Sequence, residues 1–299
     1  MRSVNKPDFT LEDFYENFVS KMSNKSKNHP DRKGKYLAIE SDLLDAEEEY
    51  KNKAKTNTLL EIKTGHPQFY NIADDLTNKD FIDLYDKFRA SKNTRKYYEK
   101  ILKLADNKCV YCEKASGNEH VDHILPKSKY DMYTVTPYNL IPSCSKCNEK
   151  KTGKVGKYYH PAFVTFNKYD IVSCELSIKE VYGRVSLIPS YKINRPQELK
   201  DEKLWKQIHQ TYEDLDLKKR YEDLATEIIN PKIKSWVNCL KQGKQVFINR
   251  IEEEKDSSES EFSKNSANIS LYNALLIKIS EDDVFCEEFK KIYIKPKIE

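Results

Sequence analysis

Two cysteine pairs enclose the stretch that decides the fold: Cys109-Val110-Tyr111-Cys112, then His120-Val121-Asp122-His123-Ile124-Leu125-Pro126, then Asn139-Leu140, then Cys144-Ser145-Lys146-Cys147-Asn148-Glu149-Lys150-Lys151. Two residues separate the cysteines of each pair, so both thiolates can reach one ion from a tight turn. Four thiolates complete the tetrahedral shell of Zn²⁺, and the pattern therefore predicts a closed, structural zinc site. Residues 113–143 must fold compactly to bring the pairs together.

The segments between and after the pairs predict a strand, a loop, a second strand and a helix. His120–Ile124 is expected to be a short strand that ends before Pro126, and Asn139–Ile141 is expected to be the second strand. Ser143 is a plausible cap for a helix over Cys144–Lys151. The zinc ion would hold these small elements together.

This order places three polar side chains where they can act together. Asp122 and His123 come at the end of the first strand, and Asn148 lies on the helix that faces it. A carboxylate and a carboxamide make a hard-oxygen site suited to Mg²⁺ or Mn²⁺. The adjacent imidazole is placed to take a proton from water.

The series Asp-His, Asn and Asn-x-x-Lys between two C-x-x-C pairs resembles the HNH, or ββα-metal, endonucleases. The resemblance is close over residues 109–160, and it extends to Tyr97-Tyr98-Glu99-Lys100-Ile101-Leu102 and Tyr159-His160-Pro161 in a subgroup of bacterial HNH proteins. Some HNH proteins of that general kind act in restriction or anti-phage defence.

The resemblance implies a role for each matching residue. His123 would be the general base, and Asp122 would be the carboxylate ligand of the catalytic ion. Asn139 would brace the loop that carries the base. Asn148 stands at the third motif position, where many members have His, and its carbonyl oxygen can still bind a hard cation. Lys151 would approach a phosphate.

Four further residues are candidates, and two of them have a structural alternative. His120 shares a strand face with Asp122, so it is either a further ligand or phosphate contact or a plain structural residue. His160 is a candidate too, although Pro161 beside it indicates a rigid turn. Lys127 and Lys129, in the loop after the expected base, are candidates for steering a nucleic-acid backbone.

Charge gives weak support for a nucleic-acid partner. The net charge of the chain is only +4, whereas residues 144–160 hold five lysines against one glutamate. A local field of that sign suits a polyanion, but a lysine run of this kind is also common on a solvated helix face.

Several features favour a cytoplasmic protein. No run approaches the roughly 18 apolar residues of a membrane span, and residues 1–6 lack the apolar core of a signal peptide. In a reducing compartment, two C-x-x-C pairs indicate metal rather than disulfides. The remaining cysteines, Cys174, Cys239 and Cys286, are expected to be small core residues.

The whole chain predicts an α+β protein that is mostly helical, with three regions. Residues 1–106 form an N-terminal helical region, residues 107–165 form the HNH module, and residues 166–299 form a C-terminal region of short strands followed by helices. Detailed expectations include a helix start with Thr10 as its cap, a buried stripe in the helical segment Asp80–Leu104, a hairpin over Ile171–Ile188 and an exposed linker at Lys255–Ser266.

The expected function is metal-dependent endonucleolytic hydrolysis of nucleic acid, with double-stranded DNA as the family default, as the effector of a bacterial anti-phage system. One alternative is a zinc-stapled nucleic-acid-binding module that does not cut. Another is an interaction subunit whose helical flanks dock on a partner such as an ATPase or sensor. The sequence leaves the target sequence and the oligomeric state open.

Overall fold

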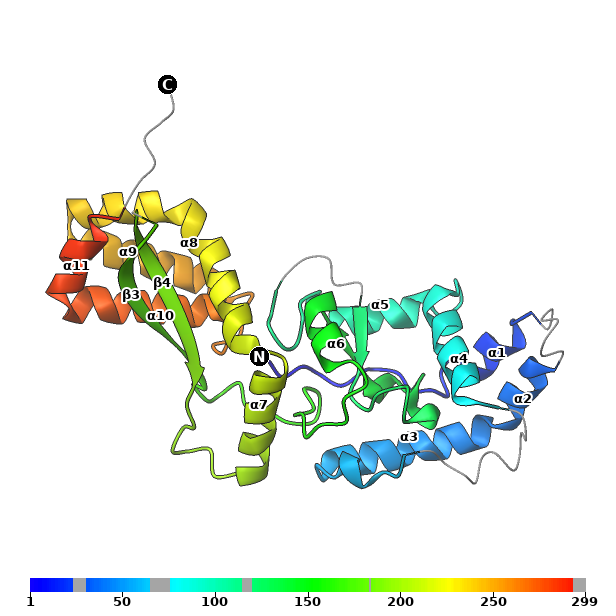
Figure 1. The fold of residues 1–299 in the computed structure, drawn as a ribbon. Helices are drawn as coiled ribbons and strands as arrows, with labels where there is room; N and C mark the ends of the chain where they lie inside the picture. Colours follow the sequence, from blue (N-terminus) through cyan, green and yellow to red (C-terminus); the bar gives the residue numbers. More distant parts are fainter. Residues whose placement is uncertain (24–30, 65–75, 115–119, 183, 293–299) are drawn as a thin grey trace. The chain divides into compact units, whose positions relative to one another are not determined.

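The computed structural model describes residues 1–23, 31–64, 76–114, 120–182 and 184–292 (Figure 1). The α+β class is confirmed, because helices dominate and the described strands form small two-stranded sheets. The chain divides into two compact units. We call residues 3–110 and 115–165 the N-terminal unit, and residues 1–2, 111–114 and 166–299 the C-terminal unit.

The N-terminal unit begins with helices. They are α1 (Tyr15–Ser20), α2 (Arg32–Ala38), α3 (Glu40–Lys55), α4 (Asn78–Ala90) and α5 (Arg95–Lys103), with a 3₁₀ turn η1 (Leu59–Glu61). The predicted helix start at Thr10 is wrong by several residues. The carboxylate of Asp13 does accept hydrogen bonds from the backbone and hydroxyl of Thr10, but they close a turn that precedes α1.

The expected apolar stripe of α4 is confirmed. Phe81, Leu84, Tyr85 and Phe88 are all buried, and they join an aromatic-rich core with α1, α3 and α5. A reciprocal capping box starts α4: Asp80 accepts from the backbone of Thr77 at 2.8 Å and from its hydroxyl at 2.7 Å. The same core includes Val121, Leu125 and Leu140, so α4 belongs to one core with the second half of the unit.

That second half has the predicted order of strand, loop, strand and helix. β1 (His120–His123) pairs antiparallel with β2 (Leu140–Ser143), with His120 opposite Ser143 and His123 opposite Leu140. Two 3₁₀ turns, η3 (Asp131–Tyr133) and η4 (Pro137–Asn139), lie in the connection, and α6 (Ser145–Lys151) follows β2.

Two local expectations in this half are wrong. Asn139 ends η4 rather than starting the second strand. Ser143 belongs to β2, and Cys144 is the N-cap of α6, with no side-chain cap. The hydroxyl of Ser143 instead donates to the carbonyl of Cys144 at 3.2 Å. The chain therefore stays extended through Cys144 before it turns into the helix.

The C-terminal unit is a hairpin with helices. β3 (Val172–Val181) and β4 (Arg184–Ile193) are antiparallel, and the hairpin continues beyond the predicted end at Ile188. The helices are α7 (Glu202–Asp214), α8 (Leu217–Gln242), α9 (Lys244–Glu259), α10 (Ala267–Glu281) and α11 (Asp283–Phe289). In this unit α10 packs on β3 and α8 packs on β4 (Figure 1).

The expected exposed linker at Lys255–Ser266 is confirmed for the exposure of residues 256, 257 and 259–261, but it is wrong for the helical start and the buried end of the segment. Its first residues continue α9, and its last two, Asn265 and Ser266, are fully buried. The side-chain oxygen of Asn265 accepts from the backbone N–H of Ile171 at 2.8 Å, and its amide donates to the carbonyl of Tyr169 at 3.0 Å. The polar side chain of Asn265 therefore satisfies buried backbone groups, whereas the polar residues 256, 257 and 259–261 face solvent.

Among the described residues, no helix combines the length and the apolar character that a membrane crossing requires.

Candidate active site and metal centre

The four predicted cysteines form a buried cluster. Their sulfur atoms all lie within 4.8 Å of one another. Tetrahedral Zn–S bonds of about 2.3 Å place neighbouring sulfurs about 3.8 Å apart, so the cluster fits a zinc ion with little adjustment. Among the remaining cysteines, Cys286 is buried, whereas Cys174 and Cys239 are partly exposed.

Local backbone geometry holds the first cysteine pair. Asp106, Asn107 and Glu113 have positive φ angles of 52°, 58° and 59°, which make sharp turns before and after the pair. Asp and Asn tolerate this left-handed conformation better than most residues. The backbone N–H of Val110 donates to the carbonyl of Pro142 at 3.2 Å, which ties the first pair to β2.

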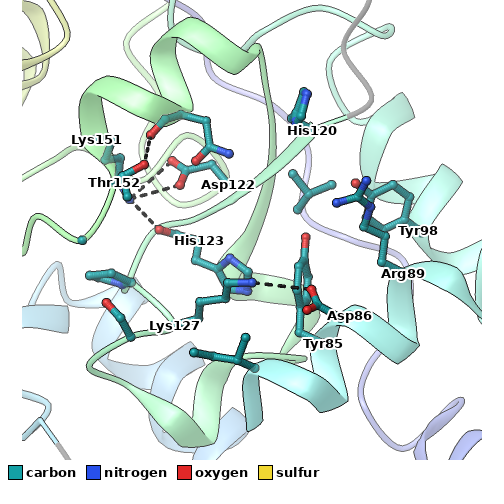
Figure 2. A pocket seen from close by; sticks show the side chains of 16 residues that line it. Tyr85, Asp86, Arg89, Tyr98, His120, Asp122, His123, Lys127, Lys151 and Thr152 are labelled. Carbon is teal, nitrogen blue, oxygen red and sulfur yellow. Dashed lines mark hydrogen bonds and ion pairs between the residues drawn. The ribbon is translucent and has the colours of Figure 1, made fainter. Parts of the chain in front are cut away.

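A cavity of about 270 Å³ lies in the N-terminal unit beside β1 (Figure 2). It brings together most of the predicted site residues, namely His120, Asp122, His123, Lys127, Asn148 and Lys151. Asn139, Lys129 and His160 do not line it. The cavity is the place where the predicted base and the predicted ion ligands could meet a substrate.

The hydrogen bond of His123 defines its tautomer. Its Nε2 atom lies 2.9 Å from the carbonyl oxygen of Thr134, which can only accept, so Nε2 carries the proton. Nδ1 therefore has the free lone pair. Burial lowers the pKa of His123 to about 3, the Thr134 carbonyl partly opposes this, and the charges of Lys127 and Lys151 lower it further. The imidazole is therefore neutral at pH 7, with Nδ1 unprotonated.

Asp122 is held by a buried ammonium. Lys151 is 2% exposed, and its Nζ lies 3.3 Å from Oδ2 and 3.4 Å from Oδ1 of Asp122 (Figure 2). The same ammonium donates to the carbonyls of His123 and Ile124. Lys151 thus fastens the end of β1 to α6. The resemblance implies that Lys151 approaches a phosphate, whereas the structure directs its charge into the protein.

Asn139 lies behind the cavity and is fully buried. Its Oδ1 accepts from the backbone of Leu125 at 2.8 Å and from the hydroxyl of Tyr50, on α3, at 3.2 Å. Its Nδ2 donates to the carbonyls of Leu125 at 3.1 Å and Tyr133 at 2.9 Å. The amide therefore spans both sides of the loop that presents the Thr134 carbonyl to His123.

The other two candidates outside the cavity have different surroundings. Both ring nitrogens of His160 are engaged: Nδ1 accepts from the backbone of Ala162 at 3.2 Å, and Nε2 lies 2.9 Å from the carbonyl of Tyr138. Burial lowers the pKa of His160 to about 4. These contacts favour the structural alternative for His160. Lys129 is exposed in the loop after β1.

The sequence did not reveal that helices α4 and α5 build one wall of the cavity. Tyr85, Arg89 and Tyr98 line it, and the ring of Tyr85 stands edge-on to His123 with centroids 4.5 Å apart. Helical periodicity indicates Tyr85 only as a core residue. One signal that could have indicated the wall is the Tyr97-Tyr98 segment, which resembles the same subgroup of HNH proteins.

Comparison with known proteins identifies the segment that contains β1, β2 and α6. The family model of the HNH endonucleases matches residues 109–154, which include β1, β2, α6 and all four cysteines. Residues 109–154 form an HNH endonuclease domain. The long helical regions on either side lie outside this match.

Two relatives share parts of the chain. It is 31% identical over 117 residues to protein ea31 of Escherichia phage lambda, covering 38% of this chain and 40% of ea31. It is 46% identical over 55 residues to Septu protein PtuB of Bacillus thuringiensis, covering 17% of this chain and 21% of PtuB. The chain thus spans less than half the length of each relative. No solved structure matches it.

Proposed function

We propose that this protein is a metal-dependent endonuclease that hydrolyses phosphodiester bonds of double-stranded DNA. The observation that carries the proposal is the cavity in which a neutral His123 lies beside Asp122 and Asn148. A base and hard-oxygen ligands in one cavity are what metal-assisted hydrolysis requires. The HNH match over residues 109–154 supports the same reaction class.

In the proposed mechanism, Nδ1 of His123 takes a proton from the water that attacks the phosphorus. The Thr134 carbonyl, 2.9 Å from Nε2, keeps the ring in the required tautomer. Asp122 and Asn148 would hold Mg²⁺ or Mn²⁺, which when bound neutralises charge that develops on the phosphate. Lys151 positions Asp122, and Asn139 positions the loop behind the base.

We propose zinc as the ion of the four-cysteine cluster. Its role would be structural, because four thiolates leave no coordination position for substrate. The ion would tie Cys109 and Cys112 to the start of α6, where Cys144 and Cys147 lie.

We also propose that the nuclease acts in the cytoplasm as the effector of an anti-phage system, together with a partner protein such as an ATPase or sensor. The similarity to Septu protein PtuB of Bacillus thuringiensis supports this setting. Copurification of a stoichiometric partner from the native host would support the partner directly.

The deciding experiment is a nicking assay on supercoiled plasmid and on RNA, with Mg²⁺, Mn²⁺ or EDTA. We expect His123→Ala to lower the metal-dependent rate by about 10²–10⁴-fold, the usual contribution of a general base. His209→Ala is the matched control, because His209 is exposed on α7 in the C-terminal unit. If wild type and His123→Ala are equally inert on every substrate, the alternative of a zinc-stapled binding module gains support.

A further inference from the structure

One wall of the active-site cavity comes from outside the HNH match. Helix α4 contributes Tyr85 and Arg89, and α5 contributes Tyr98. Figure 2 shows Arg89 and Tyr98 together on the side of the cavity that faces β1. The wall adjoins His123, because the ring of Tyr85 lies 4.5 Å from the His123 ring, centroid to centroid.

The charge of Arg89 is available to a ligand. Arg89 is exposed, and it forms no ion pair with any residue in the described part of the chain. Burial raises the pKa of the Tyr85 and Tyr98 phenols. The nearby positive charge of Arg89 partly opposes this rise at both residues. A guanidinium of this kind can bind phosphate with two parallel hydrogen bonds.

Lys127 supplies a second cation. Its Nζ lies 4.5 Å from the centre of the Tyr85 ring and 3.7 Å from Oδ1 of Asp86. The Asp86 side chain is 61% exposed, so this ion pair contributes little and can exchange for another anion. The aromatic ring keeps the ammonium near the cavity when the pair opens.

The third basic side chain of the cavity cannot serve in the same way. Lys151 is buried against Asp122 and two backbone carbonyls. Among the described residues that line the cavity, Arg89 and Lys127 are therefore the side chains whose full positive charge remains available to an anionic ligand.

We infer that Arg89 and Lys127 form a binding subsite for a backbone phosphate next to the one that is hydrolysed. The subsite rests on the proposed function, because it assigns the helical wall to the same nucleic-acid substrate. Arg89 is here a positioning residue: it holds the strand so that another phosphate reaches His123. Asp86 opposes the bound phosphate and competes for Lys127.

The test measures binding rather than cleavage. The full-length chain with His123→Ala is titrated with a short fluorescent DNA duplex, and separately with an RNA duplex, over a series of KCl concentrations. Adding Arg89→Ala should weaken binding about 10-fold and reduce the slope of log K against log [KCl] by about 0.9, the effect of one lost phosphate contact. Asp86→Asn should tighten binding several-fold.

Two control variants distinguish a phosphate contact at Arg89 from a general effect of charge and from a structural role. Lys79→Ala removes one exposed positive charge from the same helix outside the cavity, and it should change neither affinity nor slope. Arg89→Lys keeps the charge and should restore most of the slope. A structural role for Arg89 would instead lower the melting temperature, and Arg89→Lys would leave the slope reduced.

The inference is overturned if Arg89→Ala binds both duplexes with the same affinity and the same salt dependence as Lys79→Ala. It is also overturned if Arg89→Ala weakens binding only at temperatures where the variant is partly unfolded. Failure of the nuclease proposal looks different. In that case the wild type does not cut, yet Arg89→Ala still weakens binding with the reduced slope. Equal effects on DNA and RNA would identify the shared phosphate backbone as the ligand.

Discussion

Replacing Asn139 by alanine tests how the loop behind His123 is held. The substitution deprives the backbone N–H of Leu125 and the carbonyls of Leu125 and Tyr133 of their partner, at a position that is 0% exposed. Each buried group left without a hydrogen bond costs about 1–3 kcal/mol. Partial relaxation leaves an expected loss of about 3–5 kcal/mol in the free energy of unfolding.

That loss can be measured by thermal unfolding. A change of 1 kcal/mol shifts the melting temperature of a domain this large by roughly 2–4 °C, so Asn139→Ala should melt about 6–20 °C lower. The nicking rate should also fall at temperatures where the variant is folded, because the Thr134 carbonyl that orients His123 belongs to the same loop. Asn249→Ala, on the exposed face of α9, should change neither quantity.

Asn139→Asp adds a pH-dependent version of the same test. An ionised carboxylate would face the two carbonyl oxygens that now accept from Nδ2 at 3.1 and 2.9 Å. The introduced carboxyl should therefore have a raised pKa in the folded state, and the stability of the variant should fall as pH rises above about 4. If Asn139→Ala melts and nicks like the wild type, the bracing role assigned to Asn139 is refuted.

Two further predictions concern the metal cluster and a buried carboxyl. Cys144→Ser should lose about one zinc per chain, measured by elemental analysis, and should melt at a lower temperature than the wild type. The control Cys239→Ser should keep the metal. A wild-type protein that is folded without metal would contradict the structural role of zinc. Burial raises the pKa of Glu47 from its ordinary 4.5 to about 7, so the folded state binds the extra proton and loses stability as pH rises between these values. Glu47→Gln should remove this loss, so the gain in unfolding free energy of the variant over the wild type should be larger at pH 8 than at pH 4 by up to about 3 kcal/mol. If the melting temperature of the variant differs from that of the wild type by the same amount at both pH values, the prediction is wrong.

Local patterns in the sequence predicted the parts of the fold that depend on short spacing. The x₂ spacing of the cysteines predicted a cluster that the structure contains. The periodicity of α4 predicted its buried face, and the alternation of short segments predicted the order β1, β2 and α6. In each case neighbouring residues carry the whole signal.

Contacts between distant segments could not be predicted in this way. Nothing local to Tyr50 indicates that its hydroxyl donates to Asn139, and nothing local to Arg89 places it beside β1. The lysine at 151 follows the motif, but only the packing of α6 on β1 directs its ammonium toward Asp122. The polar composition of residues 255–266 predicted exposure for Asn265, but its side chain is buried and hydrogen-bonds a buried backbone group.

The hydrogen bond from Tyr50 to Asn139 bears on whether the HNH domain can be transferred alone to another protein. Residues 109–154 would not be a self-sufficient cassette. Grafted alone onto another scaffold, they would leave the amide of Asn139 short of a partner and one side of the substrate cavity open. A chimaera that keeps the proposed activity should also have to carry α3, α4 and α5, so recombination should exchange the HNH domain together with these helices, in blocks much longer than residues 109–154.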